Sequence, residues 1–123
     1  MVDELRQQLA NLDGPPAGIV LFRAPAYEDQ RLASALRHAF ACPVASCTTA
    51  GEIFDSYGRG AAVGLALSAR HFAFHQLEMP ELTGYDFQQL PALAQAILEQ
   101  PTLPGASRFG LLLVDGLSGM EES

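Results

Sequence analysis

The chain lacks lysine and tryptophan, and it holds only two cysteines in 123 residues. All seven basic residues are arginines, and 14 acidic residues bring the formal net charge to −7. These few scattered arginines form no basic patch. We therefore expect neither nucleic acid nor an anionic membrane surface as a partner. Two cysteines are too few for a disulfide scaffold, and Cys42 and Cys47 are expected to be free thiols.

Long apolar runs are also missing. No stretch approaches the roughly 20 apolar residues of a membrane-spanning helix, and residues 1–12 are too polar for a signal peptide. We therefore expect a cytoplasmic protein. With 49% hydrophobic and 17% charged residues, the composition is that of a globular chain with one domain at most.

Three segments repeat apolar residues at helical spacing: 1–12, about 28–40 and about 88–100. Five short apolar runs have the length and composition of strands: 18–22, the run from Val44, 61–69, 72–78 and 109–114. The predicted fold is α/β, a mixed sheet of about five strands with packed helices.

The order of these elements predicts some of their pairings. The strand at 18–22, the helix at about 28–40 and the strand from Val44 form a strand–helix–strand unit, which predicts parallel pairing. A turn at residues 70–71 would join the strands 61–69 and 72–78 into an antiparallel hairpin. The strand at 109–114 would lie in the centre of the sheet. The second helix is expected to bury Leu32, Ala35, Leu36, Ala39 and Phe40. The third helix is expected to bury Leu90, Leu93, Ala94, Ile97 and Leu98.

One strand ends in small polar residues. The run from Val44 leads into Ser46, Cys47, Thr48 and Thr49. Ligands of α/β proteins tend to sit just beyond such a strand end, and small hydroxyls leave room while offering donors and acceptors. The alternative is an ordinary Ser/Thr turn whose hydroxyls bond to their own backbone.

Two motifs resemble those of one family. Residues 47–53, Cys-Thr-Thr-Ala-Gly-Glu-Ile, resemble the CST-AGE-I signature of the FIST sensory domain, with Thr48 where the family usually has Ser. Residues 111–118, Leu-Leu-Leu-Val-Asp-Gly-Leu-Ser, resemble its later strand and DGLS turn. The resemblance covers most of the chain. It implies a bacterial signal-input module that binds small molecules such as amino acids and does no catalysis.

The FIST architecture has an N-terminal and a C-terminal half, and residues 1–123 resemble part of the N-terminal half only. Ser118 and Glu121 have the capping-box spacing of a helix start, yet the sequence ends at Ser123. We therefore expect a fragment with unpaired sheet edges and exposed apolar surface, which predicts self-association.

Asp115 and Gly116 follow the predicted strand at 109–114. If that strand lies parallel beside the one from Val44, Asp115 and Glu52 line one rim. Two carboxylates suit a ligand amine, while hydroxyls and backbone amides suit a ligand carboxylate. The sequence thus predicts an amino-acid site that comprises Ser46, Cys47, Thr48, Thr49, Gly51, Glu52, Asp115 and Gly116.

Two other functions stay open. Cys47, Thr48 or Thr49 could be the nucleophile of a small hydrolase or transferase, although no cation neighbours Cys47 in sequence to activate it. An exposed surface could also make the chain a scaffold for protein partners. His71 and His75 would lie roughly 13 Å apart along a strand, too far to share a metal ion. No cofactor is expected.

Overall fold

The computed structural model describes these residues: 2–26, 29–49, 52–53, 57–58, 61–79 and 84–113. The chain forms two compact units, Met1–Gln76 and Leu77–Ser123. Among the described residues, no helix has both the length and the apolar character to cross a membrane.

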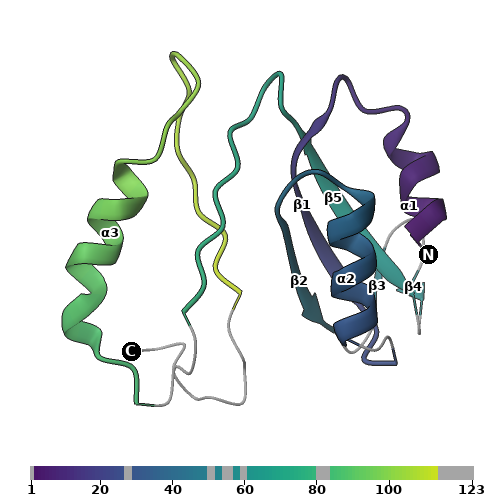
Figure 1. The fold of residues 1–123 in the computed structure, drawn as a ribbon, viewed down its shortest axis with the longest axis horizontal. Coiled ribbons are helices and arrows are strands. Elements are labelled where there is room, and N and C mark those ends of the chain that lie inside the picture. The colour runs from purple at the N-terminus through teal and green to yellow at the C-terminus, as the bar shows by residue number, and fades with distance from the viewer. Residues whose placement is uncertain are drawn as a thin grey trace. The chain divides into compact units, whose positions relative to one another are not determined.

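The first unit holds a three-stranded sheet and two helices (Figure 1). Its elements follow in the order α1 (Val2–Leu9), β1 (Pro16–Arg23), α2 (Asp29–Ala39), β2 (Val44–Thr48), β3 (Glu52–Ile53), β4 (Tyr57–Gly58) and β5 (Ala62–Ser68). The strand order is β2-β1-β5, and β3 and β4 form a separate antiparallel pair. The α/β class is therefore confirmed, but the main sheet has three strands in the described part of the chain, not five.

The central strand β1 pairs with a different geometry on each side. It runs parallel to β2, from Ile19 opposite Val44 to Arg23 opposite Thr48. This confirms the predicted strand–helix–strand unit. On its other side β1 pairs antiparallel with β5, so β5 is a partner of the first strand and not half of the predicted hairpin.

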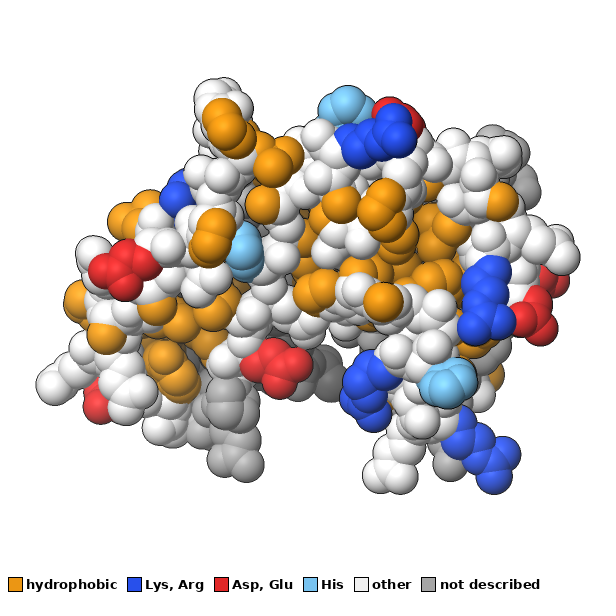
Figure 2. All heavy atoms as spheres, turned by 45° about the horizontal axis from the view of Figure 1, so that its top comes forward, with side chains coloured by type: hydrophobic (Ala, Val, Ile, Leu, Met, Phe, Trp, Pro, Cys, Tyr) orange, Lys and Arg blue, Asp and Glu red, His pale blue; other side chains and the backbone are white. Residues whose placement is uncertain are grey.

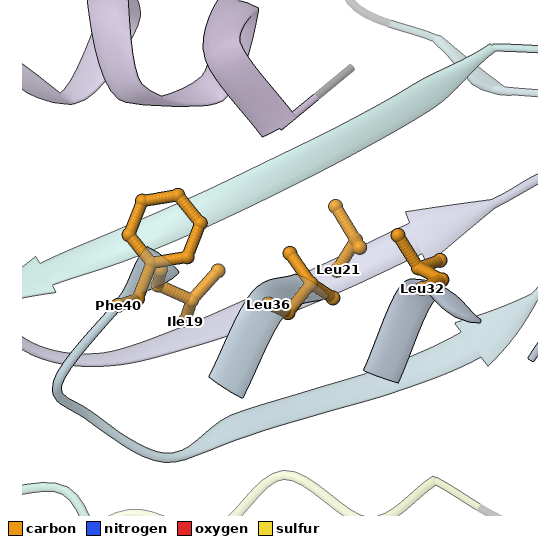
Figure 3. Close-up of a cluster of buried hydrophobic side chains, with 5 residues drawn as sticks. All are labelled: Ile19, Leu21, Leu32, Leu36 and Phe40. Atoms are coloured by element: carbon orange, nitrogen blue, oxygen red, sulfur yellow. The ribbon is translucent and has the colours of Figure 1, made fainter. Parts of the chain in front are cut away.

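One face of the sheet carries the hydrophobic core. Ile19 and Leu21 of β1 meet Leu32 and Leu36 of α2, and Phe40 just beyond it (Figure 3). Leu21 is fully buried. The helix α1 packs three residues against this cluster, Val2, Leu5 and Leu9. Ala35 is exposed, contrary to expectation, because the stripe that α2 buries follows the four-residue spacing of Leu32, Leu36 and Phe40.

The predicted strand at 72–78 is wrong. A turn does form at Arg70 and His71, where His71 N and Phe72 N donate to the Ser68 carbonyl at 3.1 and 2.9 Å. The chain beyond it forms no strand between residues 72 and 79. Instead, the ring of Phe74 lies where a side chain of Gly18 would be. The segment therefore packs on the sheet instead of pairing beside it.

In the second unit, a 3₁₀ turn (Phe87–Gln89) leads into α3 (Leu90–Leu98), with Pro91 in the first turn of the helix. Asp86 caps this start by accepting a hydrogen bond from Gln88 N at 3.0 Å. The expected buried stripe of α3 is wrong, because none of its residues is buried. Hydrophobic side chains are visible at the surface in Figure 2.

The strand expected at 109–114 is also absent over residues 109–113, all of which are exposed. A strand needs a neighbour for its backbone N–H and C=O groups. None of the described residues of this unit forms a strand, so no such neighbour is provided among them. Apolar composition alone does not supply those hydrogen bonds.

Candidate functional site

The carboxyl ends of β1 and β2 lie side by side and form a rim of the sheet. Arg23 and Thr48 are the last pair in register. Just beyond them, Thr49 N donates to the Arg23 carbonyl at 2.9 Å, and Ala24 N donates to the Ala61 carbonyl at 2.9 Å. Backbone hydrogen bonds therefore hold Arg23 from both neighbouring segments.

The small polar residues at the end of β2 do not converge on one spot. Because side chains alternate along a strand, Ser46 and Thr48 share the face of their partners Leu21 and Arg23, which is the face that carries the core. Cys47 is in register with Phe22 and lies on the opposite face. Ser46 and Thr48 are exposed, whereas Cys47 and Thr49 are half-buried.

Arg23 is the residue that sequence analysis missed. Its side chain is buried, with 7% exposure, although it is a permanently charged guanidinium. Position along β1 explains the burial: Ile19, Leu21 and Arg23 alternate onto one face, so the aliphatic stem of Arg23 continues the apolar row of the core. The available signal was this two-residue spacing, which places Arg23 in phase with two buried residues.

Neighbours on both sides of Arg23 are small. Thr48 flanks it on β2, and Ala62 flanks it on β5. The Arg23 side chain is nevertheless buried, and it has an interaction within the protein. The exposed polar groups on this face of the rim are the hydroxyls of Ser46 and Thr48.

The remaining predicted site residues are only partly described. The backbone of Glu52 lies in β3, opposite Gly58, and β3 lies close to β5. Gly51, Asp115 and Gly116 lie outside the described residues, as do Ser118 and Glu121 of the predicted cap. The side chain of Glu52 also lies outside what the structure describes.

Neither cysteine shows an arrangement typical of a catalytic thiol. Both are partly buried free thiols. Burial raises the pKa of Cys42 above its ordinary value, which lowers its thiolate fraction at neutral pH. Cys47 is in register with Phe22 on the neighbouring strand. In the described part of the chain, no group of three or more His, Cys, Asp or Glu side chains is placed to hold a metal ion.

A polar cluster lies at the other end of the sheet. Asp13 pairs with Arg70 at 2.8 Å and with His71 at 3.3 Å, and its carbonyl accepts a hydrogen bond from the Ser68 hydroxyl. These contacts join the loop after α1 to the turn after β5. All three side chains are more than half exposed, so the cluster is an ordinary surface contact between two loops.

A family model described as the FIST N domain matches residues 17–123. Neither a curated protein nor a solved structure matches the chain.

Proposed function

The chain belongs to the FIST N domain family, and from that premise we propose that it senses a small molecule for signal transduction without catalysing a reaction. The family is one of sensory, non-catalytic domains. The proposed ligand site is the rim at the carboxyl ends of β1 and β2, and the proposed ligand is an amino acid.

The observation that carries this site is the pair of neighbours at the rim, the exposed Thr48 and the buried Arg23. Their backbones are joined in register and fixed by the hydrogen bond from Thr49 N. A polar group held rigidly by the sheet loses little freedom when a ligand binds, which favours affinity.

An amino acid carries both a carboxylate and an amine, so its site needs groups that suit each of them. Ser46 and Thr48 offer hydroxyls on the face that carries Arg23. Glu52, with Gly51 beside it, would attract the ligand amine. Thr49 would lie at the margin of the site, whereas Cys47 lies on the opposite face of the sheet.

The proposal is tested by a thermal-shift screen of the 123-residue chain against amino acids and small polar metabolites. A ligand at about a hundred times its dissociation constant adds roughly 2.7 kcal/mol to the free energy of unfolding. The Thr48→Val variant removes the hydroxyl at the rim. It should lose roughly 0.5–1.5 kcal/mol of that binding energy, the value of one hydrogen bond.

Thr102→Val is the matched control, because it makes the same change at an exposed residue of the second unit. It should leave the shift unaltered. A screen without any shift would reject the sensing proposal. Equal shifts in Thr48→Val and the wild type would reject the rim as its site, and turnover of a bound compound would indicate an enzyme instead.

A further inference from the structure

Helix α1 is held to the first unit by few contacts. Its apolar residues Val2, Leu5 and Leu9 pack against the core cluster, but none of its residues is buried. The helix α2, in contrast, buries Leu32 and Leu36. A helix of only eight residues is marginally stable on its own in water, so α1 depends on these few contacts to stay formed.

The loop that follows α1 adds only a surface attachment. Asp13 pairs with Arg70 at 2.8 Å and with His71 at 3.3 Å, and all three side chains are more than half exposed. Exposed charge pairs contribute little to stability and weaken with salt. The strands β1 and β5 are joined by a ladder of backbone hydrogen bonds. Helix α1 can therefore detach at a lower cost in free energy than the sheet can open.

The surface on which α1 lies is lined by small residues. Ala62, Gly64 and Ala66 alternate along β5 onto the face of the sheet that carries the core, and α1 lies next to this strand (Figure 1). A β-carbon built on Gly64 would lie 3.8 Å from Leu5 Cδ2, an ordinary van der Waals separation. These small side chains leave room for α1 beside α2, which it also contacts. We call Ala62, Gly64 and Ala66 the α1-binding face.

The α1-binding face and its occupant differ in their relation to the family. The FIST N domain match begins at residue 17, so β1, α2 and β5 lie within the matched residues, whereas α1 precedes them. The position of α1 shows that the α1-binding face accepts an amphipathic helix with apolar residues at positions i, i+3 and i+7. Amphipathic helices that place such a stripe on an apolar surface are a recurring mode of peptide recognition.

We propose that α1 is a displaceable strap over a docking site for a helix. It leaves the α1-binding face while the rest of the first unit stays folded. The uncovered face then binds an amphipathic helix of a partner protein that repeats the apolar spacing of Val2, Leu5 and Leu9. Because both helices compete for one face, the apparent affinity for the partner falls with the fraction of chains in which α1 is closed. The strap thereby regulates access to the docking site.

Hydrogen exchange of the wild type tests the first step. The Ala10 amide donates to the Arg6 carbonyl at 3.2 Å and reports on the last turn of α1. The Ile19 amide donates to the Pro43 carbonyl at 3.0 Å and reports on β1. Protection of the α1 amides should be at least about tenfold lower, and it should change little with dilute urea, because local opening exposes little surface. Equal protection with equal dependence on urea would overturn the proposal.

A synthetic peptide of residues 1–12 with a fluorophore at its C-terminus is the probe for the second step. Fluorescence anisotropy measures its binding to the full chain. Leu5→Asp in the chain weakens the attachment of its own α1, so this variant should bind the peptide at least about tenfold more tightly than the wild type does. Gln7→Asp adds the same charge at an exposed position of α1 and should bind the peptide as the wild type does. A peptide that itself carries Leu5→Asp should not bind.

Two results of the binding experiment overturn the proposal. Equal affinity of the wild type and Leu5→Asp would place the peptide elsewhere on the chain, and binding to neither would remove the docking site. Circular dichroism checks that Leu5→Asp remains folded. If it does not, an isotope-labelled wild type decides, because an excess of unlabelled peptide should accelerate exchange of the chain's own α1 amides. Unchanged exchange would reject competition for the α1-binding face.

Discussion

At the scale of single residues, Gly18 shows how one missing side chain decides a packing arrangement. It is buried in β1, and a β-carbon built on it would overlap the ring of Phe74. The overlap involves the Cγ, Cδ1 and Cδ2 atoms of the ring, so the ring would have to move as a whole to make room. Glycine at this position is what allows the segment after β5 to lie on the sheet.

We therefore predict that Gly18→Ala lowers the free energy of unfolding by about 1–3 kcal/mol, the usual cost of overpacking. Urea denaturation measures it. Gly110→Ala is the matched control, since nothing lies within 4 Å of a β-carbon there, and it should be neutral or slightly stabilising. Equal effects of the two substitutions would contradict the contact with Phe74.

The candidate site is also decided at the residue scale. The sequence indicates the small polar residues of β2 and the family motif that contains them. It does not indicate that Arg23 is buried, because an arginine that follows an apolar run is usually exposed to solvent. Its burial results from the strands on either side of β1 and from the helix that covers this face of the sheet. The residues adjacent to Arg23 in the sequence do not reveal these contacts.

At the scale of elements, α2 and α3 share one kind of sequence pattern but differ in burial. Both have apolar residues at helical spacing. In α2 they meet the sheet and become buried. In α3 they stay exposed or half-exposed. The spacing predicts a helix in each case, but burial needs a second surface, which lies elsewhere in the chain.

The end of α3 depends on a side chain from outside the helix. Arg108 donates from Nη1 to the Ile97 carbonyl at 2.9 Å and from Nη2 to the Gln100 carbonyl at 3.1 Å. These carbonyls lie at and just beyond the end of the helix, where the amide donors of a following turn are missing; the Ile97 carbonyl also accepts from Gln100 N at 3.2 Å. Arginine near a helix end also interacts favourably with the helix dipole.

We predict that Arg108→Met frays the last turn of α3. Hydrogen exchange of the Glu99 and Gln100 amides, which donate to Gln95 and Ile97, should accelerate about fivefold, which corresponds to the loss of about 1 kcal/mol. Arg6→Met in α1 makes the same change of charge and should leave those amides unaffected. Unchanged exchange in Arg108→Met would mean that α3 ends independently of this contact.

At the scale of the whole molecule, the exposed apolar residues of the second unit stand out. Phe109 is 76% and Leu112 is 73% exposed, and Leu98 and Leu111 are each 61% exposed. Large apolar side chains exposed in this number favour association. The net charge of −7 opposes it through repulsion between copies, so we propose reversible self-association that strengthens with salt.

Sedimentation velocity over a range of concentrations tests this. Leu112→Asp should raise the dissociation constant of the self-associated form by about tenfold or more, because one buried leucine contributes about 1.5–3 kcal/mol. Ser107→Asp adds the same charge at an exposed neighbour. Equal weakening by both variants would attribute the effect to charge alone, and a monomer at all concentrations would reject the proposal.

The sequence by itself determined the local elements of the first unit and the family. Helical spacing and short apolar runs suffice for α1, β1, α2, β2 and β5, because such periods reflect which side of each element is buried. Parallel pairing of β1 and β2 follows from the helix between them. A contiguous motif at 47–53 suffices for the FIST resemblance, because it needs no tertiary contact to be recognised.

Only the tertiary structure decided which strands pair and which side chains meet. It placed β5 against β1, packed Phe74 on Gly18, set Arg23 beside Thr48 and put Cys47 on the opposite face. The physical reason is the same for all of these. Strand partners and register depend on hydrogen bonds and packing between residues far apart in the chain, and a local pattern of apolar and polar residues carries no record of those partners.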